Sequence, residues 1–259
     1  MTDPKEIVAR GYDAIAERYL AWSGLRPSAA RLRYLRLARE LIPAGAQVVE
    51  LGCGAGIPMT AALAEGRRVS GVDISPAQIR LARRNVPAAT FIEGDMTSVA
   101  FAPASVDAVV AFYSLTHVPR TELAGLLGRI RSWLRPGGIF IATMGVEDDP
   151  GTVEADWLGV DMYFSHFGAR RNRRLVEEAG FAVEQADVVA EPEDRHDARF
   201  LWVVARVPDE SPADDGPDEA ARRGRRRGDA PPARPAAGAR LDALRHERHD
   251  RPPPLPLRR

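Results

Sequence analysis

Apolar residues recur with two different periods along the first 207 residues of the chain. Residues 4–21 and 28–42 carry apolar side chains three or four positions apart, which predicts two amphipathic helices. Pro43 ends the second helix. The runs predicted as strands are 47–51, 68–72, 90–92, 106–111, 138–143, 181–189 and 200–207, and the helices predicted between them are 57–65, 76–84, 119–134 and 170–179.

Strands that alternate with helices indicate βαβ units, because parallel strands need a crossover connection that is usually helical. This pattern predicts an α/β fold in which a parallel sheet carries helices on both faces. Ligands of such sheets bind outside the carboxyl ends of the strands, where the winding reverses. The first strand–loop–helix unit is therefore the expected position of a binding site.

Composition changes sharply after Pro208. The segment 209–259 lacks Val, Ile, Phe, Tyr, Trp and Met and holds nine of the 21 prolines. A segment of this kind cannot bury enough apolar surface to offset its loss of conformational entropy. We therefore expect a folded domain over 1–208 and a disordered tail over 209–259.

Charge is separated within this tail. Residues 209–219 hold six acids and no base, whereas 220–259 hold twelve arginines and four acids. The rest of the chain has 24 basic and 26 acidic residues, so the formal net charge of zero hides the arginine-rich stretch. Such a stretch could contact nucleic acid or be a solvated extension without function, and the second reading is preferred because the core is not basic.

The chain shows no signal for a membrane, a disulfide or a metal. No run of about 18 apolar residues predicts a spanning helix, and the N-terminus lacks the apolar core of a signal peptide. Cys53 is the single cysteine, and the histidines are scattered without ligand spacing. We expect a cytoplasmic protein without a metal site.

A glycine-rich turn follows the first predicted strand. The run from Val48 to Ile57 reads VVELGCGAGI, with Gly52, Gly54 and Gly56 in the turn. Glycines let a ligand approach the backbone closely, and the expected helix N-terminus beyond them suits an anionic or carboxylate-bearing group. The spacing is G-x-G-x-G, and Ile57 stands where the dinucleotide fingerprint G-x-G-x-x-G has its third glycine.

Acids end the next two strands. Asp73 stands at the end of the second strand, where a carboxylate can accept two hydrogen bonds from a ribose diol. Asp95 follows the third strand and could accept a hydrogen bond from an adenine amine, with Ile74 and Met96 packing on the ring. The less favoured alternative for Asp95 is a turn or helix-capping residue.

Taken together, these motifs resemble the class I S-adenosylmethionine-dependent methyltransferases, and within them the broad small-molecule group of types 11 and 25. The resemblance covers about residues 7–207. It is carried by Tyr-Asp-x-x-Ala-x-x-Tyr at 12–19, VVELGCGAGIP, GVDIS, EGDM, the segment 106–117 and Leu-Arg-Pro-Gly-Gly at 134–138.

This resemblance implies a Rossmann-like three-layer sandwich, with a seven-stranded, mostly parallel sheet whose last strand is antiparallel. It implies S-adenosylmethionine as cofactor, with the methionine part on the glycine loop and its ammonium near Glu50. The residues implied to hold the cofactor are Tyr19, Glu50, Gly52, Cys53, Gly54, Gly56, Asp73, Ile74, Asp95, Met96 and Phe112. Residues 1–42 and the segment 144–168 would cover the substrate, with Tyr12 packed in the core.

Two histidines are candidate catalytic residues. His117 lies just beyond the fourth strand and could act as a base, although a structural His bonded to nearby backbone is the alternative. His166 lies in the aromatic segment 144–168. Cys53 is interpreted as a small residue that contacts the ligand.

We therefore expect a methyltransferase acting on O, N or C of a small organic acceptor, as a monomer or homodimer that contacts neither membrane nor nucleic acid. Three alternatives are a nicotinamide-dependent oxidoreductase on a similar sheet, an RNA-associated methyltransferase that uses the arginine tail, and a protein that binds the cofactor without transferring its methyl group. The missing third glycine disfavours the first of these.

Overall fold

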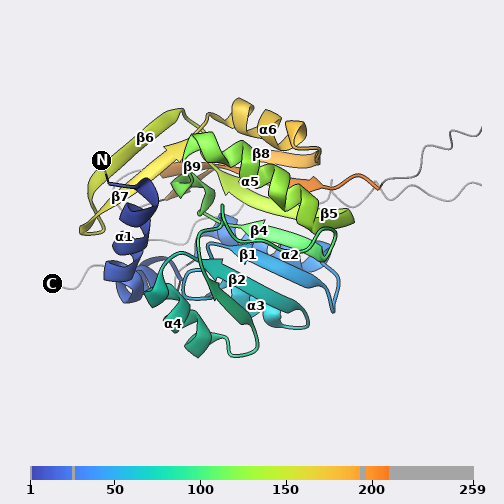
Figure 1. The fold of residues 1–259 in the computed structure, drawn as a ribbon, viewed down its shortest axis with the longest axis horizontal. Coiled ribbons are helices and arrows are strands. Elements are labelled where there is room, and N and C mark those ends of the chain that lie inside the picture. Colours follow the sequence, from blue (N-terminus) through green and yellow to red (C-terminus); the bar gives the residue numbers. More distant parts are fainter. Residues whose placement is uncertain (1, 25–26, 193–196, 210–259) are drawn as a thin grey trace, which may run out of the picture. The chain divides into compact units, whose positions relative to one another are not determined.

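The computed structural model describes residues 2–24, 27–192 and 197–209 of the 259-residue chain (Figure 1). Apart from Asp209, the segment predicted as a disordered tail lies outside the described residues, and so does His196.

Seven strands form the central sheet, in the order β3-β2-β1-β4-β5-β9-β8. Every neighbouring pair from β3 to β5 is parallel, and β9 runs antiparallel to both β5 and β8. This confirms the predicted sheet with its antiparallel last strand. The strands are β1 (Gln47–Leu51), β2 (Arg68–Asp73), β3 (Thr90–Glu93), β4 (Val106–Ala111), β5 (Leu134–Met144), β8 (Ala182–Pro192) and β9 (Asp197–Arg206).

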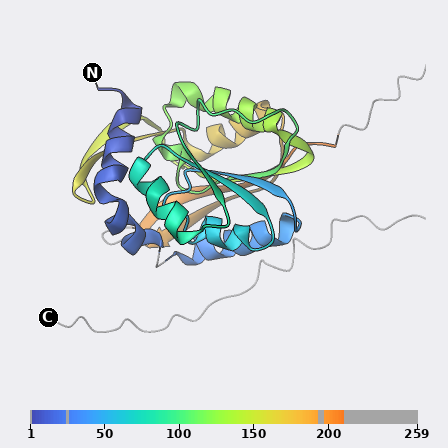
Figure 2. The same ribbon diagram turned by 60° about the horizontal axis from the view of Figure 1, so that its bottom comes forward.

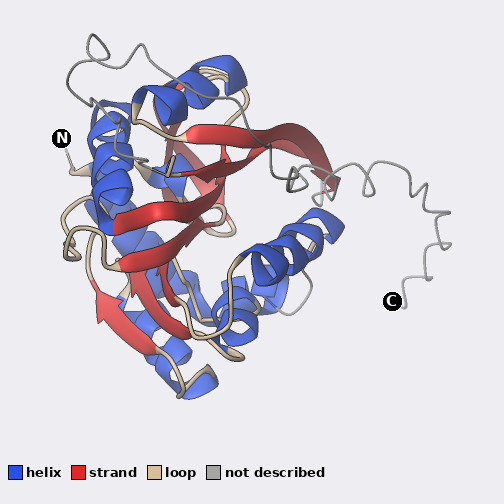
Figure 3. Ribbon diagram, turned by 90° about the vertical axis from the view of Figure 1, so that its right-hand side faces the viewer, coloured by secondary structure: helices blue, strands red, loops and turns tan. Residues whose placement is uncertain are grey.

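Helices cover both faces of this sheet (Figure 3). Consecutive residues of a strand point to opposite faces, so Val48 packs with Tyr34 and Leu63, while Val49 packs in the core that contains Leu127. The α/β prediction with three layers is thus confirmed. The helices are α2 (Ala29–Leu41), α3 (Met59–Ala64) and α4 (Pro76–Asn85) on one face, and α5 (Arg120–Trp133) and α6 (Ala169–Glu178) on the other.

A separate cover stands at one end of the sheet. It consists of α1 (Pro4–Tyr19), a π-helical turn (Leu20–Gly24) and a hairpin of β6 (Asp149–Trp157) and β7 (Val160–His166). Helix α1 and the hairpin lie side by side in Figures 1 and 2, and Val8 of α1 packs against Met162 and Tyr163 of β7.

This hairpin was not predicted from the sequence, in which no strand was expected within 144–168. The reason is physical: almost every residue of β6 is exposed, so the strand has no alternation of apolar and polar residues for a pattern to detect. The turn that joins the strands, Leu158-Gly159, has positive φ at both residues, but Leu stands where the common Asn-Gly turn has Asn, so the sequence carries no hairpin signal.

Other elements differ from the prediction in their bounds. Helix α3 is shorter than the predicted 57–65 and begins at Met59, after Pro58. Strand β5 begins at Leu134 and includes Pro136 and Gly137, which were predicted to precede it. None of the helices in the described part of the chain is long and apolar enough to cross a bilayer.

The buried face of α5 offers a test of the core. Leu127 is fully buried, and Leu127→Ala should lower the free energy of unfolding by about 2–5 kcal/mol, because the deleted atoms leave a cavity. Leu32 of α2 is 38% exposed, and Leu32→Ala should cost less than about 1 kcal/mol. Urea unfolding followed by circular dichroism measures both, and equal losses would contradict this description of the core.

Candidate active site

The glycine loop connects β1 to α3 at the carboxyl edge of the sheet. Gly52, Gly54 and Gly56 all have positive φ, at 73°, 54° and 78°. A Cβ at Gly52 would lie 2.2 Å from the Cβ of Ser114, so a side chain has no room there. The N–H groups of Gly52 and Cys53 both donate to the carbonyl oxygen of Val72, which ties the loop to β2.

Two buried carboxyl groups lie beside this loop. Glu50 is 4% exposed and accepts a hydrogen bond from Thr60, and burial raises its pKa to about 8. Asp73 accepts hydrogen bonds from the N–H groups of Gly54 (2.8 Å) and Ser75 (2.9 Å). Burial raises the pKa of Asp73 to about 6, and the two backbone donors act against that rise.

A pocket opens above the loop, with about 460 Å³ of empty space including its mouth. Six of the residues expected at the cofactor site line it: Tyr19, Glu50, Gly52, Cys53, Gly54 and Phe112. The other five expected residues, Gly56, Asp73, Ile74, Asp95 and Met96, do not line it. The pocket thus corresponds to the part of the site predicted for the methionine end of the cofactor.

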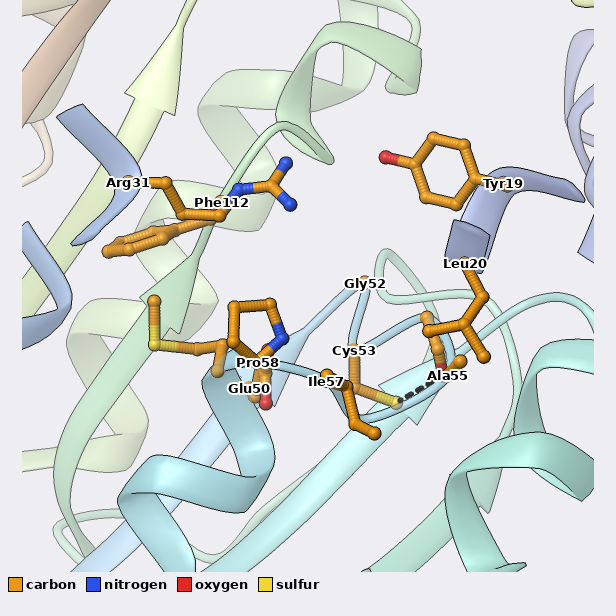
Figure 4. A pocket seen from close by; sticks show the side chains of 12 residues that line it. Tyr19, Leu20, Arg31, Glu50, Gly52, Cys53, Ala55, Ile57, Pro58 and Phe112 are labelled. Carbon is orange, nitrogen blue, oxygen red and sulfur yellow. Dashed lines mark hydrogen bonds between the residues drawn. The ribbon is translucent and has the colours of Figure 1, made fainter. Parts of the chain in front are cut away.

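Arg31 also lines this pocket, and the sequence analysis did not select it. In Figure 4 its guanidinium lies across the mouth from the ring of Tyr19. Arg31 sits in the first turn of α2, where Ser28 caps the helix by accepting a hydrogen bond from the Arg31 N–H (3.1 Å). The sequence contains many arginines, and nothing in its pattern indicated which of them would line a pocket.

Asp95 is engaged by several donors. Its carboxylate accepts hydrogen bonds from Lys5 Nζ (2.8 Å) and from the N–H (2.8 Å) and hydroxyl (2.6 Å) of Thr97. Burial acts to raise the pKa of Asp95, but these donors outweigh it and hold the pKa below its usual value. Lys5, the only lysine of the chain, also contacts Glu122 (2.5 Å), so it joins α1 to two other segments.

This arrangement agrees with the turn-forming alternative for Asp95, whereas its contact with adenine stays a prediction. Met96 packs against the core that contains Leu127, and Ile74 packs against the cluster formed by α1 and β7.

His117 is buried and has a partner at each ring nitrogen. Its Nδ1 lies 2.8 Å from the carbonyl oxygen of Tyr163, so Nδ1 carries the proton and Nε2 accepts from the Tyr12 hydroxyl at 2.8 Å. Burial lowers the pKa of His117 to about 4, so the ring is neutral at neutral pH. These contacts favour the structural role that the sequence left open, and a role as base stays a prediction.

An aromatic cluster joins the cover to this region. Tyr12 and Tyr19 meet edge to face at 5.0 Å, and Trp157 of β6 lies 5.8 Å from Tyr12 and 6.0 Å from Tyr19. Phe164 of β7 contacts the His117 ring at 4.8 Å. The packing of Tyr12 therefore matches the core position expected for it.

Asp13 holds α1 in place beneath this cluster. Its carboxylate accepts hydrogen bonds from the Ser75 hydroxyl (2.6 Å) and the Ala77 N–H (2.8 Å), at the start of α4.

The remaining two candidates lie in different surroundings. His166 Nδ1 lies 2.7 Å from the carbonyl oxygen of Glu147 at the base of the hairpin, and His166 does not line the pocket. Cys53 is 6% exposed, and burial raises the pKa of its thiol, which fits a small contact residue better than a nucleophile. Among the described residues no group of three or more His, Cys, Asp or Glu side chains is placed to hold a metal ion.

Comparison with known proteins decides the family. A family profile described as "Methyltransferase domain" matches residues 48–138, which run from β1 through the glycine loop to the Pro-Gly-Gly sequence in β5. Residues 48–138 therefore form a methyltransferase domain of the class I S-adenosylmethionine-dependent type.

Two curated relatives show how this chain compares in sequence. A trans-aconitate 2-methyltransferase of Paracidovorax citrulli is 37% identical over 111 residues, which cover 42% of this chain and 42% of that protein. A ubiquinone biosynthesis O-methyltransferase of Xanthomonas campestris pv. campestris is 30% identical over 143 residues, covering 51% and 59%. The chain spans about half the length of the curated relatives it matches.

Solved structures share the fold of this chain. A 1,6-didemethyltoxoflavin-N1-methyltransferase of Burkholderia thailandensis, solved with its substrate and S-adenosylhomocysteine, aligns with a TM-score of 0.62. It is 21% identical and covers 81% of this chain and 92% of its own. At this identity the likeness concerns the fold alone.

Two glycines with the same backbone conformation test the loop. Gly45 has φ 78° and open space around its Cβ position, whereas the Cβ of Gly52→Ala would meet Ser114. Gly45→Ala should lower the free energy of unfolding by about 1–2 kcal/mol, because a residue with a Cβ is disfavoured in the left-handed conformation. Gly52→Ala should cost more and should also weaken binding of S-adenosylhomocysteine by more than about tenfold, since the loop must move. Calorimetry measures both, and equal binding by the two variants would show that the Gly52–Ser114 contact is unimportant.

Proposed function

We propose that this protein transfers a methyl group from S-adenosylmethionine to a small organic acceptor. The observation that carries the proposal is the pocket itself, in which the glycine loop, the buried Glu50 carboxyl and the Arg31 guanidinium converge. The amino acid end of a ligand carries an ammonium and a carboxylate. An acidic side chain can bind the ammonium and a basic side chain can bind the carboxylate. The nucleoside would extend toward Asp73, which has lone pairs left for ribose hydroxyls.

The residues present fit that cofactor. The Gln78 side chain is 1% exposed, and its amide nitrogen and oxygen have no hydrogen-bond partner among the described residues. Its Oε1 lies 3.8 Å from the Cβ position of Gly54, beside the loop. A buried amide without partners is costly, and a polar ligand on the loop could satisfy it.

The bound cofactor supplies an electrophilic methyl group, so the protein mainly orients the two reactants and excludes water. Glu50 and Arg31 would hold the amino acid end, and Phe112 would pack beside it. The aromatic cluster of Tyr12, Tyr19 and Trp157 would cover the acceptor and keep water out.

We propose that the acceptor atom is already nucleophilic when it binds, so that no side chain has to deprotonate it. His117 is neutral and both of its nitrogens have partners, so it offers no free base at this edge. We infer an acceptor that is nucleophilic without deprotonation by His117, such as an amine or an already ionised oxygen. The aromatic cover favours a small, largely apolar molecule over nucleic acid.

A thermal-shift comparison tests the cofactor. S-adenosylhomocysteine at about 100 times its Kd should add about 2.7 kcal/mol of stability and raise Tm by about 5–10 °C, whereas NADH should have no effect. Stabilisation by NADH alone would support the oxidoreductase alternative. Binding without methyl transfer to any of a panel of small amines, phenols and carboxylates would support a protein that only binds the cofactor.

The raised pKa of Glu50 predicts that cofactor binding depends on pH. Free Glu50, with its pKa of about 8, is mostly protonated at pH 7, and a ligand ammonium beside it favours the ionised form. Binding should therefore release a proton, and affinity for S-adenosylhomocysteine should rise roughly five- to tenfold per pH unit between about pH 6.5 and 7.5. Calorimetry in buffers of different ionisation enthalpy counts the protons released. Glu50→Gln cannot ionise and should bind without this proton release; an unchanged proton count in that variant would rule Glu50 out.

A further inference from the structure

Glu191 is a buried carboxyl group outside the pocket, and three side chains donate hydrogen bonds to it. It lies on β8 and is 5% exposed. The Tyr113 hydroxyl lies 2.9 and 2.7 Å from its two oxygens, and Trp202 Nε1 lies 3.1 Å from one of them. The Ser28 hydroxyl completes the set. A buried carboxyl with this many donors fixes the position of each donor, because losing one leaves a costly unsatisfied group.

Tyr113 is the donor in an unusual backbone conformation. It has φ 59°, which residues other than glycine rarely adopt, and its N–H donates to the hydroxyl of Thr143. Such a conformation persists only where the surrounding structure imposes it, and it often marks a functional site. Here the phenol is anchored by Glu191, and the ring packs edge to face on Phe200 at 4.9 Å.

The anchored ring of Tyr113 supports Arg31. The Arg31 Cζ lies 4.3 Å from the centre of the Tyr113 ring, in cation–π geometry. Ser28, a second partner of Glu191, caps the helix that carries Arg31. Glu191 therefore acts on Arg31 twice, through the aromatic ring beneath its guanidinium and through the first turn of its helix.

We propose that Tyr113 and Glu191 are positioning residues that hold the Arg31 guanidinium at the mouth of the pocket, where it selects ligands carrying an amino acid carboxylate. This inference rests on the proposed function, since the carboxylate is that of the cofactor. A guanidinium recognises a carboxylate through a rigid fork of donors, so its orientation decides how much binding energy it contributes. A flexible Arg31 would keep its charge and lose most of this selectivity.

Two ligands that differ only at this end test the proposal. S-adenosylhomocysteine has the amino acid group, and 5′-methylthioadenosine has a methyl group in its place. Arg31→Met should reduce the preference for the first ligand by roughly ten- to hundredfold. Tyr113→Leu and Glu191→Gln should each reduce it by roughly three- to tenfold, with affinity for methylthioadenosine within about twofold of the wild type. Tyr113→Phe keeps the ring and should have an effect no larger than that of Tyr113→Leu.

A double-mutant cycle separates positioning from a general structural role. If Tyr113 acts through Arg31, Tyr113→Leu should have little further effect on the preference in the Arg31→Met background. Glu184→Gln is the control for Glu191→Gln, because Glu184 lies on the same strand but pairs with Arg206 at the surface. Should Glu191→Gln fail to fold, the Tyr113 variants and this cycle still decide the question.

The possible results are distinct. Equal losses of affinity for both ligands, or an additive effect of Tyr113→Leu in the Arg31→Met background, would overturn the positioning role while leaving the proposed cofactor intact. Wild-type protein that binds neither ligand would overturn the proposed function, and the inference with it.

Discussion

The close contact between Gly52 and Ser114 fixes how the two central strands end. Strands β1 and β4 are parallel neighbours, so the chain leaves both of them at the same edge of the sheet. The Ser114 hydroxyl donates to the carbonyl oxygen of Leu51 at 2.7 Å, and only a glycine at position 52 allows that approach. Because Gly52 is also tied to Val72 of β2, the ends of three strands are held in one arrangement. The positions of Glu50, Asp73 and Phe112 depend on it.

Electrostatics at this edge follow from burial. Glu50 and Asp73 lie in surroundings of low polarity that penalise their charged forms, which raises the pKa of both. The pKa rises less for Asp73 because two backbone N–H groups stabilise its anion. Among the described residues, Arg31 is the one cation that lines the pocket. Its positive charge acts to lower the pKa of Glu50, against the effect of burial. The pocket thus places Glu50, a carboxyl group that is mostly protonated at pH 7, close to the permanent positive charge of Arg31.

The cover depends on a few polar attachments between distant segments. Lys5 joins α1 to Asp95 and Glu122, Asp13 joins it to the start of α4, and Tyr12 joins it to His117. Each attachment reaches a different element that surrounds the carboxyl edge of the sheet. Together with the apolar packing of Val8 on β7, they give α1 a defined position at this edge.

The sequence by itself determined the α/β architecture, the glycine loop and the acids at the strand ends. These features follow from local periodicity and from one topological rule: parallel strands bring their carboxyl ends to the same edge. The glycine loop with Gly52 was assigned to a site on this basis, the family resemblance added Glu50 and Phe112, and all three line the pocket.

Only the tertiary structure decided which side chains complete that site. Arg31, Tyr113 and Glu191 come from segments far apart in sequence, and no period or motif links them. The engagement of Asp95 by Lys5 and of His117 by Tyr12 is equally non-local. The β6–β7 hairpin has a strand exposed to solvent, which removes the alternation that burial would impose. Local patterns record which face of an element is buried, whereas the partners of a polar side chain depend on how the elements pack together.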